Sequence, residues 1–355
     1  MTSPSLSPGP TGAADPTWSG YVCPACKGPL DAEPEAYVCA RCGRYPIILG
    51  IPDFRVFPDP YIDIEEDRRK GTRLAERAGA TDFVGLLNFY WAITPDTPQE
   101  LAARYVRNDS VGVARGRQML QELQAEVPGL AVGPGLRILE LGCRAGGFLV
   151  AAAERSAAVV GVDIAFRWLV VARKQLGERG LEARLVCACA EALPFPDGAF
   201  DLVTAGNVLE HTEDQAGLLR ETHRALRPGG AFFAVTCNRF SLGPEPHVRV
   251  WGVGFLPRRF MSGYVRWVRG VPYQHIRLAS PFELRRMLAR SPFGPSRLGL
   301  AALNAAERQG LPAHERLLLA AYERLRRSRL LRPLLLVFAP LFQFACVRQD
   351  RRPTG

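Results

Sequence analysis

The stretch ILELGCRAGG, at residues 138–147, places a glycine-rich turn directly after an apolar strand and before a helix. Glycine lets the backbone approach a bound ligand closely, and the next helix presents its N-terminal N–H groups at the same place. Asp163 follows Gly142 by 21 residues, at the end of the next expected strand, where a carboxylate can accept both ribose hydroxyl hydrogens. These features predict a nucleotide-type cofactor site. Alone, they suit nicotinamide and methionine-derived cofactors equally.

Outward from this turn, strands and helices alternate along the chain. The expected strands cover residues 136–141, 158–163, 183–187, 200–206 and 231–237, with a closing strand at 341–348. Helices are expected at residues 166–176 and 214–226, and a further helix restarts at Ser280 with a capping box. This alternation predicts an α/β fold with helices on both faces of a mostly parallel sheet.

Three further motifs follow the turn in order. They are AEALPFPDGAFD at residues 190–201, NVLEH at 207–211 and LRPGG at 226–230. With Glu140 two residues before the first glycine, they closely resemble class I S-adenosylmethionine-dependent methyltransferases, and most of all the group containing the ubiquinone and menaquinone biosynthesis methyltransferases. The resemblance covers about residues 136–237. It implies a Rossmann-like, mostly parallel seven-stranded sheet and S-adenosylmethionine as the methyl donor.

The resemblance also implies roles for single residues. Gly142 and Gly146 would lie against the methionine part of the cofactor, and Asp163 would hold the ribose. The backbone N–H of Ala190 would meet the adenine, and Asn207 would lie beside the cofactor's amino acid. The remaining members of the implied cofactor-binding set are Glu140, Cys143 and Glu191.

Two positions depart from the family pattern. Arg144 stands where the family usually has glycine, and we expect a side chain to fit there if the turn keeps φ negative. Cys189 stands where the family usually has an aspartate that pairs with the adenine amino group, and a thiol is a poor acceptor. Both changes are expected to weaken cofactor binding.

A second cysteine-based pattern lies near the N-terminus. Cys23 and Cys26 form one Cys-x-x-Cys pair, Cys39 and Cys42 form another, and twelve residues separate the pairs. Two such pairs supply four thiolates for a tetrahedral, closed and therefore structural zinc site; the alternative is two redox or chance pairs. The following YPIILGIPDF resembles the ending of small zinc-ribbon domains that are fused to, or act beside, methyltransferases.

These patterns predict the division of the chain. Residues 1–20 form a disordered tail rich in Ser, Pro, Gly and Thr, and residues 21–57 form a zinc ribbon. Residues 58–130 form a helical cap or linker. Residues 131–349 form the methyltransferase domain, with a lid insertion at 238–279. Residues 1–20 lack the features of a signal peptide, so we expect a cytoplasmic protein.

Two histidines are candidate bases for the acceptor. Methyl transfer from a sulfonium is an in-line displacement, so the protein mainly aligns the reactants, and an oxygen nucleophile gains from a nearby base. His211 is expected to end the fourth strand, where the crevice of such sheets lies, and His247 lies in the insertion. Either can be catalytic, or a hydrogen-bonded structural histidine. The insertion is also expected to wall the acceptor with aromatic side chains, namely Trp251, Phe255, Tyr264 and Trp267.

Composition and charge limit the classes of function that are possible. Hydrophobic residues make up 47% and charged residues 23%, which excludes wholesale disorder and a multi-span membrane protein. The net charge is +10, with +15 from residue 239 onward and −5 before it. We predict methyl transfer to a small organic or lipid-like acceptor, at oxygen. The alternatives are an rRNA or tRNA methyltransferase, against which no RNA-binding module is recognisable, and a non-catalytic methyltransferase-like partner protein.

The basic segment at residues 311–332 is the expected origin of a peripheral membrane contact. Its leucines and arginines suit a helix lying on an anionic membrane surface. A helix packed on the sheet with its arginines in water is the favoured alternative, because most amphipathic helices face a core. Both readings stay open at this point.

Overall fold

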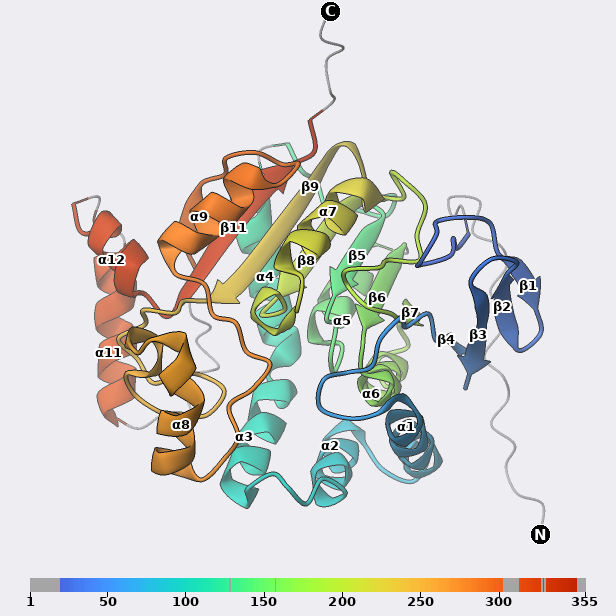
Figure 1. Ribbon diagram of the computed structural model, residues 1–355, viewed down its shortest axis with the longest axis horizontal. Coiled ribbons are helices and arrows are strands. Elements are labelled where there is room, and N and C mark those ends of the chain that lie inside the picture. The colour runs from blue at the N-terminus through green and yellow to red at the C-terminus, as the bar shows by residue number, and fades with distance from the viewer. Residues whose placement is uncertain are drawn as a thin grey trace, which may run out of the picture.

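The computed structural model describes residues 20–302 and 313–349, except 128, 157, 327 and 329. Its main feature is a seven-stranded sheet in the order β10-β11-β9-β8-β5-β6-β7 (Figure 1). The strands are β5 (Ile138–Leu141), β6 (Val159–Asp163), β7 (Arg184–Cys187), β8 (Phe200–Gly206), β9 (Leu226–Cys237), β10 (Leu298–Leu300) and β11 (Leu341–Val347). β5 to β9 pair in parallel, whereas β10 and β11 are antiparallel. The predicted α/β fold is confirmed.

The order of the strands places the site. The chain runs from β5 through β6 to β7 on one side, then returns to β8 and β9 on the other side of β5. In open parallel sheets, ligands bind where the order reverses, beyond the carboxyl ends of the strands. That place lies between β5 and β8, where the turn after Leu141 and the segment after Gly206 meet.

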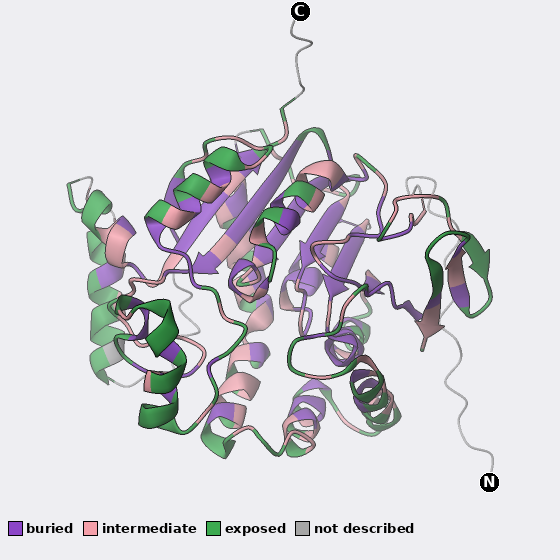
Figure 2. Ribbon diagram, viewed as in Figure 1, coloured by how far each residue is buried: buried purple, intermediate pink, exposed green. Residues whose placement is uncertain are grey.

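Helices cover both faces of the sheet, because alternate strand residues point to opposite sides. Ile138 packs in the cluster of buried residues that includes Leu120, Leu149 and Leu169. Leu139 belongs instead to the cluster on the other face, where α7 and α9 lie (Figures 1 and 2). The helices are α4 (Gly112–Glu126), α5 (Gly147–Ala153) and α6 (Phe166–Gly177) on the first face, and α7 (Gln215–Ala225) and α9 (Pro281–Arg290) on the second.

The cysteine pairs belong to a small unit at the β7 edge of the molecule, with the first pair in the turn before an antiparallel sheet and the second pair at the turn between two of its strands (Figure 1). Its strands are β1 (Asp31–Glu33), β2 (Ala36–Cys39), β3 (Gly43–Ile48) and β4 (Ile51–Pro52). Lys27 forms an ion pair of 2.6 Å with Glu221 of α7. After β4, Asp53 forms a parallel bridge with Cys187 of β7. The N-terminal sheet is therefore joined to the large sheet by side chains and backbone.

Three helices precede α4 and close the lower side of the molecule in Figure 1. They are α1 (Ile64–Ala78), α2 (Phe83–Ala92) and α3 (Gln99–Ser110). Asp63 and Asp82 cap α1 and α2 by accepting backbone N–H bonds. α1 packs closely on α6 at Gly71, where a Cβ atom would lie 2.5 Å from the Phe166 ring. The expected helical segment is thus present, interrupted between Ala92 and Gln99.

The last part of the chain differs from the expectation in one respect. The basic segment predicted as one helix over 311–332 forms α11 (Ala313–Leu325), and a second helix, α12 (Arg332–Phe338), begins at its end. Pro333 lies in the first turn of α12, where proline fits because no intrahelical hydrogen bond is needed from its nitrogen. The expected tail, up to residue 19, lies outside the described residues. Among the described helices, none is long and apolar enough to cross a membrane.

Candidate functional site

The glycine-rich turn follows β5 at the reversal point of the sheet. Gly142 has φ +64°, and a Cβ atom there would lie 2.4 Å from Cγ2 of Val208, so this position excludes any side chain. Gly146 has φ +83° and caps α5. Arg144 has φ +45°, so its side chain is present although the turn does not keep the negative φ that was set as the condition for it. A bulky residue in this region costs free energy, and neighbouring contacts must hold it there.

The contacts of Arg144 provide that restraint. Its guanidinium forms hydrogen bonds of 2.9 and 3.1 Å with the carboxylate of Asp109, at the end of α3. It also lies over the ring of Trp168 in α6, at 4.1 Å from the centroid, and faces Tyr105 of α3 at 5.7 Å. Arg144 therefore ties the cofactor turn to the helices that cover it.

Two buried carboxyl groups lie beside the turn. Asp163 ends β6, and its oxygens accept the backbone N–H groups of Arg144 and Ala165 at 2.7 and 2.9 Å. Burial raises the pKa of Asp163 to about 6, although these two hydrogen bonds act in the opposite direction. Burial and the charge of Asp163 raise the pKa of Glu140 well above its ordinary value. Cys143, in the turn after β5, is also buried.

This carboxyl pair fits the implied cofactor. Among the described residues, Oε2 of Glu140 is buried without a hydrogen-bond partner. A buried acceptor without a partner is costly, and two adjacent acids favour a positively charged ligand. S-adenosylmethionine carries a sulfonium and an ammonium group, and its ribose offers two hydroxyl donors for Asp163. The donor and acceptor set is thus suitable for that cofactor.

The part of the site that is expected to bind adenine lies next to a segment that was not singled out in the sequence. Residues 53–59, which we call the connector, run from β4 past β7. Phe54 donates its N–H to the Cys187 carbonyl at 2.7 Å, and the Cys189 thiol donates to the carbonyl of Phe57 at 3.6 Å. Ala190 is half-buried in the turn that follows. Glu191 accepts the N–H of Glu213 at 3.2 Å, so it joins this turn to the loop before α7.

Buried ion pairs fix the connector. The guanidinium of Arg55 is fully buried and pairs with Asp53 at 2.6 Å and Asp67 of α1 at 2.7 Å. It also donates to the carbonyl of Ile164, the residue after Asp163, at 3.2 Å. Arg167 of α6 pairs with Asp59 and Asp67. Asp53, Arg55 and Asp59 lie close together in the sequence. Charged residues are usually exposed to solvent, so the sequence alone did not indicate that these side chains are buried.

On the other side of the turn, the two candidate histidines come together. His211 ends a short 3-10 helix (Leu209–His211), five residues beyond β8 rather than at its end. Its ring lies 4.7 Å from that of His247, at an interplanar angle of 87°. Asn207, with φ +57°, begins this segment and accepts a hydrogen bond from the Cys237 thiol at 3.7 Å. Burial and the neighbouring His247 lower the pKa of His211 to about 4.

His247 has a partner that the sequence reasoning did not single out. Its Nδ1 lies 2.5 Å from Oε1 of Glu245, a carboxylate that is only 4% exposed. Burial lowers the pKa of His247, but the hydrogen bond and charge of Glu245 outweigh it and raise the pKa above the ordinary value. In the sequence, the pairing could have been suspected because a single residue, Pro246, separates Glu245 from His247.

Ligand atoms of Glu210, His211 and His247 also gather within 4.8 Å of one another, as in a metal site. However, Glu210 already accepts hydrogen bonds from Thr236 and the N–H of Cys237, at 2.8 and 3.3 Å. With His247 also bound to Glu245, the group is assigned as a hydrogen-bonded cluster.

The aromatic side chains of the insertion do not form the expected wall. Trp267, in α8 (Arg258–Arg269), is 83% exposed, and Trp251 and Phe255 are both exposed as well. The Tyr264 hydroxyl donates to the carbonyl of Trp251 at 3.1 Å, on the surface. A small separate core of the insertion is made by other residues, including Val250, Val265 and Tyr273.

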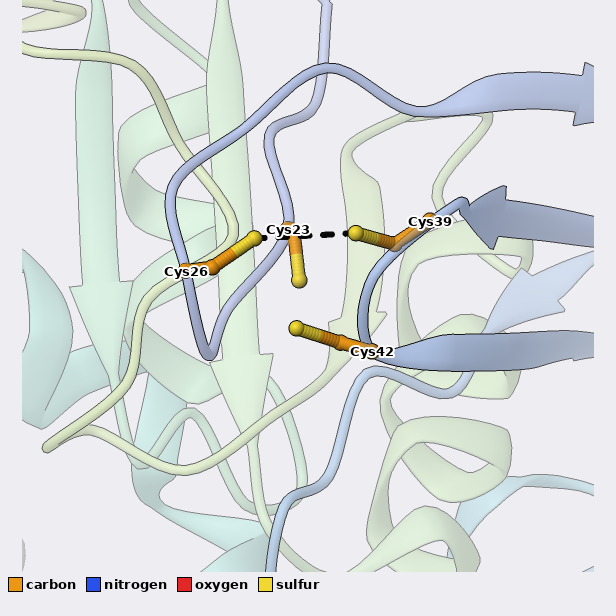
Figure 3. Close-up of side chains that lie close together, drawn as sticks. All are labelled: Cys23, Cys26, Cys39 and Cys42. Atoms are coloured by element: carbon orange, nitrogen blue, oxygen red, sulfur yellow. Dashed lines mark hydrogen bonds between the residues drawn. The ribbon is translucent and has the colours of Figure 1, made fainter.

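The four cysteines of the N-terminal sheet converge as predicted (Figure 3). Their sulfur atoms all lie within 4.8 Å of one another, and Sγ of Cys26 and Cys39 are 3.6 Å apart. Burial raises the pKa of Cys23, but hydrogen bonds from Tyr45 and the backbone N–H groups of Cys26 and Ala25 bring it down to about 6. A thiolate within a closed set of four sulfurs fits a structural Zn²⁺ ion.

Comparison with known proteins identifies the family. The family model described as "Methyltransferase domain" matches residues 139–234. A ubiquinone biosynthesis O-methyltransferase of Idiomarina loihiensis is 36% identical over 154 residues, which is 43% of this chain and 59% of the relative. A demethylmenaquinone methyltransferase of Thermus thermophilus is 34% identical over 181 residues, covering 48% of this chain and 82% of the relative.

A solved S-adenosylmethionine-dependent methyltransferase from Mesorhizobium loti is 24% identical, with 66% of this chain and 96% of that chain covered and a TM-score of 0.43. The chain spans 59% of the length of the Idiomarina relative and more than four fifths of the Thermus relative. With the glycine turn and Asp163 at the reversal point of the sheet, the Thermus relative and the family model show that the chain belongs to the class I S-adenosylmethionine-dependent methyltransferases.

Proposed function

We propose that this enzyme transfers the methyl group of S-adenosylmethionine to a hydroxyl oxygen of a small lipid-like acceptor. The observation that carries the choice of oxygen is the contact between His211 and His247 beside the crevice, with Glu245 behind His247. A hydroxyl gains from a base as it attacks, and the Idiomarina relative is named a ubiquinone biosynthesis O-methyltransferase. The Thermus relative, named a demethylmenaquinone methyltransferase, supports a lipid-like acceptor but not the choice of atom.

The bound cofactor supplies a methyl group already activated on a sulfonium. For its binding, we assign the ribose to Asp163 and the amino group to the unpartnered oxygen of Glu140. The N–H of Ala190 is assigned to the adenine, and Asn207 to the cofactor's amino acid side. Their common task is to hold the methyl carbon in line with the acceptor oxygen and to keep water away.

For the N-terminal region, we propose a structural zinc ion held by Cys23, Cys26, Cys39 and Cys42. The proposed domain limits follow: a ribbon at residues 21–57, a helical segment at 58–130 and a methyltransferase unit at 131–349. About 37 residues cannot bury enough apolar surface to fold alone, so the ion is expected to stabilise the ribbon.

The experiment is transfer of tritiated methyl from labelled cofactor to defined acceptors. The purified protein is incubated with short-chain isoprenoid hydroquinones, with the same compounds blocked at oxygen, and with total RNA. We expect label only in hydroquinones that have a free hydroxyl. Label on a ring carbon would contradict the oxygen assignment, and label in RNA would contradict the lipid-like acceptor.

A further inference from the structure

Glu245 is built into the protein as a fixed acceptor. Its Oε2 accepts the backbone N–H groups of His247 and Val248, both at 2.8 Å, while its Oε1 contacts Nδ1 of His247. An ionised carboxylate can only accept hydrogen bonds, so Nδ1 of His247 must carry the proton. In the neutral ring, Nε2 is then left unprotonated and can take a proton.

The loop that carries this pair is held from two directions. Within the loop, Glu245 donates its N–H to the carbonyl of Val250 at 2.8 Å, and Arg249 donates back to the carbonyl of Glu245 at 2.8 Å. From α3, the Tyr105 hydroxyl donates to the His247 carbonyl at 3.2 Å, and Arg104 donates to the carbonyl of Pro246 at 3.0 Å. The imidazole is therefore fixed by contacts on both sides.

The charges around the two histidines separate their roles. Burial and Arg104 oppose the protonated form of His247, but Glu245 and Glu210 outweigh them. His211 is kept neutral by burial, by His247 and by Arg144. Burial raises the pKa values of the hydroxyl groups of Tyr61, Tyr105 and Tyr273 and of the Cys237 thiol, and the negative charge of Glu245 adds to the rise in each. Two neighbouring groups with opposed pKa shifts are the usual arrangement of a base and its neutral neighbour.

We propose that Glu245 is the positioning residue of a Glu245–His247 base that takes the hydroxyl proton of the acceptor. As the acceptor oxygen bonds to the methyl carbon, the carbon–sulfur bond breaks with its electron pair going to sulfur. The hydroxyl proton goes to Nε2 of His247, and Glu245 stabilises the resulting imidazolium. This inference rests on the proposed transfer to oxygen.

The test compares Glu245→Gln with Glu245→Asp and with Glu213→Gln. The glutamine keeps the size of the side chain but removes its charge. Glu213→Gln is the matched control, because it removes the same charge from an exposed residue on the loop after His211. With the hydroquinone acceptor, kcat should fall about tenfold or more in Glu245→Gln, and KM for the cofactor should stay unchanged. The acid limb of the kcat–pH profile should move to lower pH, because a less basic His247 loses its proton earlier.

Partial recovery in Glu245→Asp is expected, and Glu213→Gln should behave as the wild type. An unchanged kcat–pH profile in Glu245→Gln would overturn the proposal, since a merely structural glutamate would not set that profile. So would activity that depends on an added divalent cation, because the cluster would then bind metal instead.

Histidine NMR separates this failure from failure of the proposed function. The chain has five histidines, so the ring signal of His247 can be assigned by its loss in His247→Gln. Glu245→Gln should lower the pKa of that signal and change its tautomer, whether or not any acceptor is methylated. If no hydroquinone is methylated, the proposed function fails; if the His247 signal is unchanged, the positioning role fails.

Discussion

The cofactor side and the acceptor side of the crevice are built by different means. On the cofactor side, backbone groups at the ends of β5 and β6 make the site, and Asp163 is held by two backbone N–H groups. On the acceptor side, side chains from distant segments meet, such as Tyr105 and His247, which are 142 residues apart. The cofactor side therefore depends on the sheet, whereas the acceptor side depends on a few hydrogen bonds. Substitutions should therefore affect cofactor affinity on one side and turnover on the other.

The largest expected effect comes from removing the proposed zinc ion. Elemental analysis should find one zinc per chain, and Cys39→Ser should lose it together with the folded ribbon, since such ions supply about 10–16 kcal/mol in small zinc domains. Because the connector joins the ribbon to Ile164 and Cys189, cofactor affinity should also fall. His247 should keep its NMR signal. Zinc-free protein with unchanged cofactor affinity would show that the connector does not serve the cofactor side.

The turn after β5 gives the next largest effect. Gly142→Ala must place a Cβ atom 2.4 Å from Val208 at a positive φ, so the turn has to move. Strain of about 1–3 kcal/mol should weaken cofactor binding by roughly tenfold to a hundredfold. Gly180→Ala is the matched control, because Gly180 has φ +63° but nothing within 4 Å of the added atom. Equal cofactor affinities in the two variants, measured by calorimetry, would contradict the role of the turn.

Asp163 gives a pH-dependent prediction. Its pKa of about 6 means that the carboxylate is lost as the pH falls below 6, and only the ionised form accepts both hydroxyls and attracts a cation. Cofactor affinity should fall about tenfold between pH 7 and pH 5. Calorimetry with Asp163→Asn should show weaker binding that no longer depends on pH in this range. A wild-type affinity for the cofactor that rises toward pH 5 would contradict this role of Asp163.

The smallest effect concerns the surface beyond the acceptor side. Tyr322 packs α11 into the core of the sheet, and its hydroxyl donates to the carbonyl of Ala301 at 2.8 Å. Leu317 and Leu318 of the same helix are 73% and 55% exposed, so a membrane contact of this outer face stays a prediction. Arg327 and Arg329, which belong to the same expectation, lie outside the described residues. Each arginine is worth about 1 kcal/mol at an anionic surface at low salt. Anionic vesicles should sediment more protein than neutral ones. Equal amounts would leave α11 without a membrane role.

The sequence predicted the parts of this molecule that depend on local patterns. The strand–turn–helix at Gly142, the four cysteines and the capping box at Ser280 all have fixed spacings with a direct physical meaning. The conformation of Arg144 was not predictable, because its positive φ is held by Asp109 and Trp168, which are distant in sequence. The exposure of Trp267 was missed for a related reason: aromatic content does not tell which face of an isolated helix meets the core.

The most direct test of the account is a paired measurement on Asp163→Ala and His247→Ala, with cofactor affinity by calorimetry and methyl transfer to the hydroquinone. Asp163→Ala should lose about 2–3 kcal/mol of cofactor binding. His247→Ala should bind the cofactor as the wild type does and lower turnover about a hundredfold or more. The opposite pattern, with normal binding in Asp163→Ala and lost binding in His247→Ala, would contradict the assignment of both sides.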